Sequence, residues 1–267
     1  MRRLTPQALK GEIRRPIEVA VEDLPRLHGD AVGACIRRTL CKCGVIRFRL
    51  SEISPDILLD VASVIGEPSE QRVYGAHAEQ VTRDTLHLLA DPIWQQSPPD
   101  IALLAAGAGA AGQGGLISAS RTMAYEALSP AMKRYLDGME ACHDASQPLA
   151  SACETPDQLR WLATLRERHP PQRHALSFAL AENGKKALGV SPAFTAAIQG
   201  VPQEEGRAVL SHLKALFEEP ESQCRIEWEE GLVVIWNPRA TLLYPYGEED
   251  VPFPVSYVAL KRRDMVT

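Results

Sequence analysis

The groups best suited to bind a metal are spread thinly along this 267-residue sequence, which has six cysteines and seven histidines. Cys41 and Cys43 form a C-x-C pair directly before the alternating run Gly44 to Leu50. A zinc site would need a second Cys/His pair at ligand spacing, and the sequence has none. We therefore expect this pair to be small, half-buried residues at the entrance of a strand. Without a secretory signal, all six cysteines are expected to be free thiols.

His87 and Asp91 are a second pair of candidate ligands. In an extended strand, His87, Leu89 and Asp91 would share one face. At a rise of about 3.3 Å per residue, however, His87 and Asp91 would lie about 13 Å apart, too far to share one metal. No histidine follows His212 to supply a further ligand. We expect His87 to be a buried or strand-surface residue.

The glycine-rich segment 107–115, GAGAAGQGG, has the composition of a nucleotide-binding loop. A P-loop needs Gly-Lys followed by Ser or Thr to hold phosphates, and none follows here. A dinucleotide-binding turn must open a helix, whereas the next residues, LISAS, have a strand pattern. We expect a flexible connection between two strands.

The elements that would position these groups are of both kinds. Helices are predicted from apolar residues at helical spacing and from start signals such as Ser54-Pro55 and Ser129-Pro130, and strands from alternating or short apolar runs. The polar, proline-bearing segment 145–173 is predicted to be an insertion or a lid. The predicted helices are 23–42, 54–66, 129–143 and 203–219, and the predicted strands are 44–50, 83–95, 100–106, 116–120, 224–230, 231–236, 239–244 and 255–262.

Composition excludes several classes of protein. The formal net charge is −5 and the basic pairs are scattered among acids, so a nucleic-acid partner is not expected. No apolar run approaches the roughly 20 residues that span a bilayer, so no membrane partner is expected either. The first ten residues carry a basic pair without a following hydrophobic stretch, unlike a secretory signal. These observations predict a cytoplasmic protein, and 45% apolar residues are enough for a substantial core.

Five stretches follow one another along the chain: LCKCGVIRFRLSEISPDILLDVASVIGEP, LADPIWQQSPPDIALLAA, GQGGLISASRTMAYEALSPAMKRYLDGMEACHD, GKKALGVSPAFTAAIQGVPQEEGRAVLSHL and IEWEEGLVVIWNPRATLLY. In this order they resemble the taurine/alpha-ketoglutarate dioxygenase (TauD/TfdA-like) family. The resemblance implies an α+β fold, a double-stranded β-helix (a jelly-roll or cupin-like barrel) flanked by helices, in a single domain of residues 1–267.

The resemblance also places the iron site. Such an oxygenase holds Fe(II) with two histidines and one carboxylate. Anchored on Trp94, the His-x-Asp pair falls on Leu89 and Asp91, and the distal histidine falls on Leu243. The carboxylate is kept, and both histidines are replaced by leucine.

The 2-oxoglutarate positions are altered as well. The threonine that would contact this co-substrate falls near Gly115, and the family's Asp-Asn-Arg reads Asn237-Pro238-Arg239. The window for the basic residue that would clamp the co-substrate, Phe253 to Ser256, holds no Arg or Lys. We therefore expect neither Fe(II) nor 2-oxoglutarate as a cofactor, and no metal ligands. The substrate pocket implied by the family's positions comprises Leu89, Asp91, Trp94, Gly115, Asn237, Arg239, Leu243 and Tyr244.

Asp91 and Arg239 are the catalytic candidates, each with two interpretations. Asp91 is either a structural remnant paired to Arg239 or another donor, or an acid or base whose pKa is raised by the apolar site. Arg239 forms either a strand-end salt bridge or an anchor for a substrate carboxylate. Trp94, Trp236 and Tyr244 are expected around the barrel mouth. His143, His169 and His174 would serve only a different active site.

Two classes of function follow from this pattern. In the first, the protein is non-catalytic: a partner subunit of an active oxygenase paralogue, or a module that binds a small molecule. In the second, it is a metal-independent enzyme of small-molecule metabolism that reuses the family's substrate pocket. A dioxygenase with relocated ligands is disfavoured because no histidine follows His212. By analogy with the family, the flanking amphipathic helices would suit a homo-oligomer.

Overall fold

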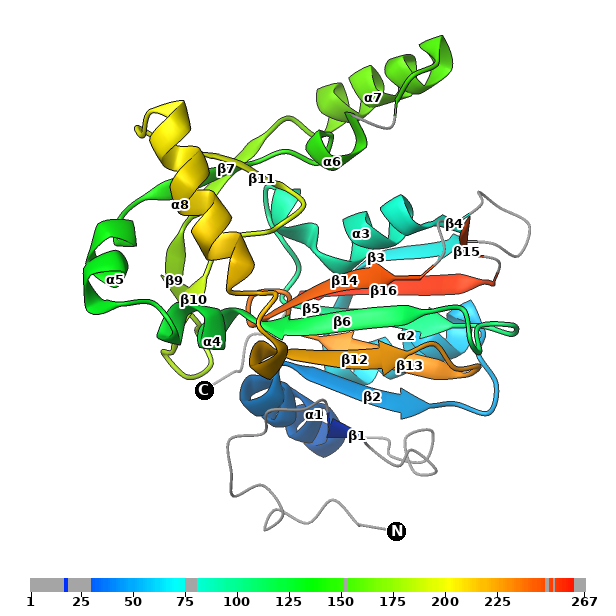
Figure 1. The fold of residues 1–267 in the computed structure, drawn as a ribbon. Helices are drawn as coiled ribbons and strands as arrows, with labels where there is room; N and C mark the ends of the chain where they lie inside the picture. The colour runs from blue at the N-terminus through cyan, green and yellow to red at the C-terminus, as the bar shows by residue number, and fades with distance from the viewer. Residues whose placement is uncertain are drawn as a thin grey trace.

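The computed structural model describes residues 17–18, 30–74, 81–150, 153–247, 250–251 and 253–261. Two antiparallel sheets face each other across an apolar interior, with helices outside them and a second group of short strands and helices at one end (Figure 1). This is the jelly-roll arrangement that the family resemblance implied.

The larger sheet has the strand order β1-β2-β13-β5-β16-β3. Only the β1–β2 pairing is parallel. Alternation sets the two faces: Val234 and Trp236 of β13 point into the interior, whereas Val233 and Ile235 point outward. The bounds are β1 Ile17–Glu18, β2 Val45–Arg49, β13 Leu232–Trp236, β5 Ile101–Ala106, β16 Val255–Lys261 and β3 Glu67–Tyr74.

The smaller sheet has the order β12-β6-β14 and closes the interior from the opposite side. Leu116 of β6 and Leu243 of β14 point inward, and Leu242 and Tyr244 of β14 point outward. The bounds are β12 Gln223–Glu227, β6 Gly115–Ser120 and β14 Thr241–Tyr246. The glycine-rich segment 107–115 joins β5 to β6, as predicted.

Two helices, α1 (Asp30–Cys43) and α2 (Pro55–Ile65), cover the outer face of the larger sheet. Ser54 caps α2 by accepting a hydrogen bond from the Ile57 backbone N–H, as the Ser-Pro start predicted. The predicted residues 23–29 lie outside the described part. No disulfide joins the six cysteines, and Cys41 and Cys43 are half-buried where α1 leads into β2.

A second layer of helices packs against the outer face of the smaller sheet. The helix predicted at 129–143 is wrong in its second half, because Gly138, with φ of 76°, ends the helical stretch and a strand follows. The elements of this region are α4 Arg121–Glu126, α5 Pro130–Leu136, β7 Glu140–His143, β8 Gln172–Ala175, β9 Ser177–Ala179, β10 Lys186–Leu188, β11 Thr195–Ile198, α8 Gln203–Ala215 and η4 Pro220–Ser222.

The predicted strand at 83–95 is wrong. This segment forms a helix, α3 (Arg83–Ala90), followed by the short turn η3 (Pro92–Trp94). Thr82 caps α3 by accepting from the Thr85 N–H, and Asp84 lies in the first turn. Leu86, Leu89 and Ala90 have the i, i+3, i+4 spacing of one buried helical face, which the apolar content of this segment concealed. Short strands β4 (Val81–Thr82) and β15 (Asp250–Val251) pair beside it.

The segment 145–173 is largely helical. It contains α6 (Gln147–Ala150) and α7 (Pro156–Arg168), and α7 extends away from the body of the protein (Figure 1). A capping box formed by Thr155 and Gln158 starts α7. Among the described residues, no helix is long and apolar enough to cross a membrane.

Candidate functional site

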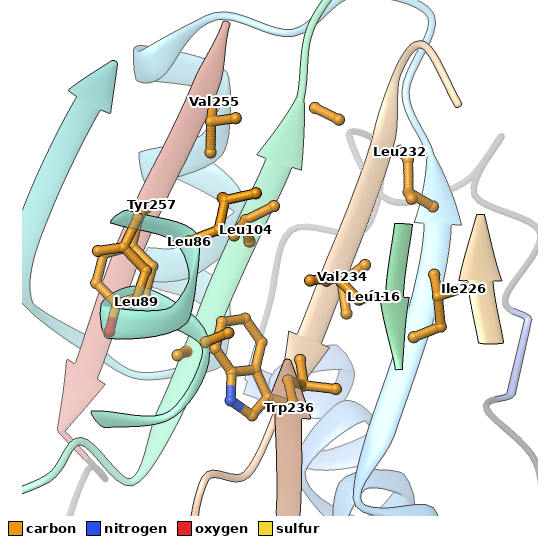
Figure 2. Packing of buried hydrophobic residues seen from close by; sticks show 14 of the residues in the cluster. Leu86, Leu89, Leu104, Leu116, Ile226, Leu232, Val234, Trp236, Val255 and Tyr257 are labelled. Atoms are coloured by element: carbon orange, nitrogen blue, oxygen red, sulfur yellow. The ribbon is translucent and has the colours of Figure 1, made fainter. Parts of the chain in front are cut away.

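The two positions at which histidines were expected lie in one buried cluster. Leu89 of α3 is 5% exposed and Leu243 of β14 is fully buried, and both pack with Trp236 and Tyr257 in the interior between the sheets. Figure 2 shows Leu86 and Leu89 extending from α3 towards the strands that carry these aromatic residues. Burying a leucine side chain contributes about 1.5–3 kcal/mol, so these positions now stabilise the fold as part of its core.

Asp91 follows α3 directly and is bound by an arginine that the sequence did not single out. Its Oδ1 accepts a hydrogen bond of 2.7 Å from Nη2 of Arg121, and both side chains are almost fully buried. Asp91 is therefore paired to a donor, and that donor is Arg121 rather than Arg239.

Arg121 makes further hydrogen bonds that hold it in place. Its Nε donates to the Pro238 carbonyl at 3.0 Å, and its Nη1 donates to the carbonyls of Val190 at 2.7 Å and Leu188 at 3.3 Å. The guanidinium thus ties the end of α3 to the turn between β13 and β14 and to the segment after β10. Arg121 acts as a buried cross-link between segments distant in sequence.

Burial and pairing act in opposite directions on this ion pair. Burial raises the pKa of Asp91, and the charge of Arg121 and hydrogen bonds from Ser191 and the Ile93 backbone oppose that rise. Burial also lowers the pKa of Arg121, opposed by Asp91. A pair this deep depends on each partner, since either charge left alone would be strongly unfavourable.

Gly115 occupies a position with no room for a side chain. It opens β6 opposite Tyr246 of β14 and Glu227 of β12. A Cβ at this position would lie 2.2 Å from the Ile226 carbonyl oxygen and 2.9 Å from the Tyr246 ring. Even the first carbon of a threonine side chain would require the strands to move.

Asn237 and Arg239 shape the turn between β13 and β14. The Asn237 Oδ1 accepts from the Arg239 backbone N–H at 2.9 Å, and its Nδ2 donates to Glu182 at 3.1 Å. The exposed Arg239 guanidinium lies over the Phe178 ring, 4.7 Å from its centre, and forms no ion pair within the described residues. The prediction of a strand-end salt bridge for Arg239 is wrong, because its guanidinium makes a cation–π contact with Phe178 instead.

The aromatic residues expected at the barrel mouth are distributed over three separate clusters. Trp236 is in the interior, Trp94 packs with Phe194 and donates its Nε1 hydrogen to the Leu88 carbonyl, and Tyr244 lies on the outer face of β14. The Tyr244 hydroxyl accepts from Gln223 at 2.8 Å. The interpretation of these residues as walls of one pocket is wrong, because the three side chains belong to three different clusters. Tyr244 points away from the interior because it alternates with Leu243 between the two faces of β14.

The histidines are placed differently from what the sequence suggested. His87 lies on a helix, where four residues span about 6 Å, so the separation of 13 Å from Asp91 was wrong. His143 is buried, its Nδ1 is 3.0 Å from the Thr195 hydroxyl, and burial lowers its pKa to about 3. It neighbours His174, with ring centres 5.5 Å apart. Within the described ranges, no group of three or more His, Cys, Asp or Glu residues is arranged to hold a metal.

The model of the taurine catabolism dioxygenase TauD, TfdA family matches residues 2–242. The chain belongs to this family. Among its curated relatives is the alpha-ketoglutarate-dependent dioxygenase cnsP of Penicillium expansum, 29% identical over 175 residues that cover 62% of this chain and 46% of the relative. Another is the alpha-ketoglutarate-dependent 2,4-dichlorophenoxyacetate dioxygenase of Burkholderia sp. (strain RASC), 26% identical over 196 residues, with coverage of 73% and 62%. The chain thus spans less than two thirds of the length of these relatives.

Solved structures agree on the TauD fold. A taurine dioxygenase from Burkholderia xenovorans superposes with a TM-score of 0.71 at 23% identity, covering 93% of this chain and 87% of that one. The structure of AAD-2 in complex with Mn(II) and N-oxalylglycine superposes with a TM-score of 0.79 at 17% identity, covering 95% and 97%. At these identities the likeness establishes the fold.

TauD-family relatives are named for their dependence on alpha-ketoglutarate, so the fit of that co-substrate and of iron can be tested against the residues present. Leu89 and Leu243 have no atom that ligates a metal, and Asp91 is bound to Arg121. Gly115 has no hydroxyl and no room for one. These residues do not fit a centre of two histidines and one carboxylate with 2-oxoglutarate beside it.

Sequence reasoning missed two features of the site. Arg121 gave no signal, because a single arginine after a strand is more often a surface residue. The helical form of 83–90 was signalled by Thr82 with Asp84 and by the leucine spacing, and the apolar content of the segment outweighed both. These two features together determine where Asp91 lies and which residue it pairs with.

Proposed function

We propose that this chain is a non-catalytic member of the TauD family, a partner subunit of an active oxygenase or a homologue that binds a small molecule. The observation that carries the proposal is the packing of Leu89 and Leu243, at the positions of the metal-binding histidines, into one buried apolar cluster. Since neither side chain can coordinate a metal, the chemistry typical of the family lacks its centre.

The second support is the state of the retained carboxylate. A carboxylate that binds a metal must offer its oxygens to it, whereas Asp91 is 3% exposed and gives one oxygen to Arg121. Arg121 is itself held in place by hydrogen bonds to the Pro238 and Val190 carbonyls. The proposal therefore rests on the whole environment of the former site rather than on two substitutions alone.

A metal-binding measurement tests this proposal. The purified chain is titrated with Mn(II), followed by N-oxalylglycine, in a calorimeter, with AAD-2 as the positive control because that protein is known in complex with both. We expect AAD-2 to bind and this chain to give no stoichiometric heat for either. Binding of about one metal per chain at micromolar affinity would refute the proposal.

The partner-subunit form of the proposal has its own measurement. An oxygenase paralogue with intact His-x-Asp and distal histidine is assayed alone and with this chain, and light scattering records the mass of the mixture. We expect a hetero-complex with increased stability or turnover of the paralogue. If the chain forms only homo-oligomers and leaves the paralogue unchanged, the ligand-binding form remains.

The alternative is a metal-independent enzyme, for which Asp91 would be the acid or base because burial raises its pKa. This alternative requires a substrate to reach a carboxylate that is 3% exposed. It predicts that Asp91→Asn abolishes turnover of the substrate while leaving ligand binding intact, whereas a purely structural Asp91 predicts loss of stability alone.

A further inference from the structure

A pocket of about 280 Å³ lies outside the barrel interior, between the first turns of α3, helix α6 and the end of β14. None of the positions at which the family resemblance placed the substrate pocket lines it. One wall is apolar and includes Leu149 of α6, Phe194 and Pro245 of β14. The charged and polar part of the lining includes Arg83, Asp84 and His87 of α3.

Arg83 places a guanidinium in this pocket. Its Nη1 lies 3.4 Å from the Gly247 carbonyl oxygen, at the long limit of a hydrogen bond, and it forms no ion pair within the described residues. The adjacent Asp84 is exposed and lies in the first turn of α3, where its charge favours the helix N-terminus. Among the described residues, most of the hydrogen-bonding capacity of Arg83 is therefore unused.

His87 lies on the same face of α3, four residues after Arg83. Burial and the neighbouring Arg83 lower its pKa to about 4, so the imidazole is neutral at pH 7. A neutral imidazole offers one N–H donor and one acceptor, and in the described part of the chain no hydrogen bond involves the His87 ring. The polar lining thus combines the positive charge of Arg83 and a neutral donor at His87 with the exposed carboxylate of Asp84.

We propose that this pocket binds a small organic monocarboxylate, with its carboxylate at Arg83 and His87 and its apolar part against Leu149 and Phe194. A guanidinium matches the planar geometry of a carboxylate through two parallel N–H donors. A single positive charge with Asp84 close by suits a monoanion better than a phosphate dianion. The volume, slightly below the usual range for ligand pockets, limits the apolar part to one ring or a short chain.

This site is independent of the former iron position, and it gives a location to the ligand-binding form of the proposed function. Phenylacetate serves as the probe, because it joins one ring to one carboxylate. It is titrated by calorimetry into the metal-free protein, with its neutral isostere phenylacetamide in parallel. We expect phenylacetate to bind and phenylacetamide to bind at least about tenfold more weakly, since a charge-assisted hydrogen bond contributes that much.

Arg83→Gln is the matched variant, with Arg160→Gln on the exposed face of α7 as its control. We expect the first to weaken phenylacetate binding at least about tenfold and the second to leave it unchanged. Both variants are checked by circular dichroism and thermal unfolding. In NMR spectra, the imidazole resonances of His87 should shift on binding while those of the exposed His212 stay in place.

The proposal is overturned by any of three results. These are no binding of phenylacetate up to about 10 mM, equal binding of phenylacetamide, or unchanged affinity in a folded Arg83→Gln variant. Binding that leaves the His87 resonances unmoved would place the ligand elsewhere and also overturn it. Metal binding in the separate Mn(II) titration would refute the non-catalytic function and leave the carboxylate result untouched.

Discussion

Replacing Arg121 by methionine should destabilise the protein strongly and in a pH-dependent way. The substitution leaves Asp91, 3% exposed, without its cationic partner, and removes the donor to the Pro238 and Val190 carbonyls. Removing one partner of a buried ion pair costs about 3–5 kcal/mol. Domains have a total stability of about 5–15 kcal/mol, so this loss should lower the midpoint of thermal unfolding by roughly 10 °C.

The pH dependence identifies the cause. Burial raises the pKa of Asp91 and the charge of Arg121 opposes the rise, so the variant should have a still higher pKa in the folded state. At pH values between the folded-state pKa of Asp91 in the natural protein and that in the variant, Asp91 is protonated in the folded variant and ionised in the folded natural protein. The variant therefore loses stability relative to the natural protein as pH rises, by at most about 1.4 kcal/mol per pH unit.

The assay is urea unfolding followed by tryptophan fluorescence at several pH values between 5 and 8. Arg239→Met is the control, because Arg239 is exposed and its guanidinium lies over the Phe178 ring, and this substitution should cost less than about 1 kcal/mol. The double variant Asp91→Leu with Arg121→Met should be more stable than Arg121→Met alone, since no unpaired charge remains. A cost for Arg121→Met that equals that of Arg239→Met, or that does not change with pH, would refute the role assigned to Arg121.

Three further predictions concern the core, the strand packing and the pocket. Leu243→Ala should cost about 2–5 kcal/mol in urea unfolding because it leaves a cavity in the interior; a cost near zero would mean the site is not packed. Gly115→Ala should lower the free energy of unfolding, because the added Cβ would lie 2.2 Å from the Ile226 carbonyl oxygen. Gly206→Ala within α8 has room for a Cβ and should raise the free energy of unfolding by about 0.5–1 kcal/mol, so equal effects of the two substitutions would contradict the clash. NMR titration should show the His87 imidazole gaining its proton near pH 4 in the folded protein, and titration near pH 6.5 would contradict its burial. Because the unfolded chain protonates His87 at a higher pH than the folded protein does, the free energy of unfolding should fall as the pH drops from 6.5 towards 4, and His87→Gln should make this fall smaller.

The sequence predicted most of the barrel because its strands carry their own pattern. Alternate residues of β13 point into the interior and towards the outer face. The short, continuous apolar run before Asn237 predicted a strand buried on both faces, as observed. Helix α2 was predictable at both ends, from the Ser54 cap and from Gly66. In these elements, local preference and tertiary packing favour the same structure.

The site was less predictable because its contacts join distant segments. Asp91 and Arg121 are 30 residues apart and come together only when α3 and α4 are placed around β14. The apolar residues of 83–90 fit the pattern of either a strand or a helix. The helix is favoured by its Thr82 cap and by the burial of Leu89 in the interior. The resemblance could place Leu89 and Leu243 where it implies histidines, and only the fold could show which residues surround these two side chains.

Helix α3 and β14 also have a consequence for association between molecules. β14 is an outer strand of its three-stranded sheet, and such an edge offers backbone groups to which another chain can add a strand. Pro245, within β14, has no amide hydrogen to donate, and α3 packs against the same strand. A helix satisfies its hydrogen bonds internally, so α3 covers this strand without extending the sheet. Proline and helix together protect the β14 edge from the edge-to-edge pairing that leads β-rich chains to aggregate.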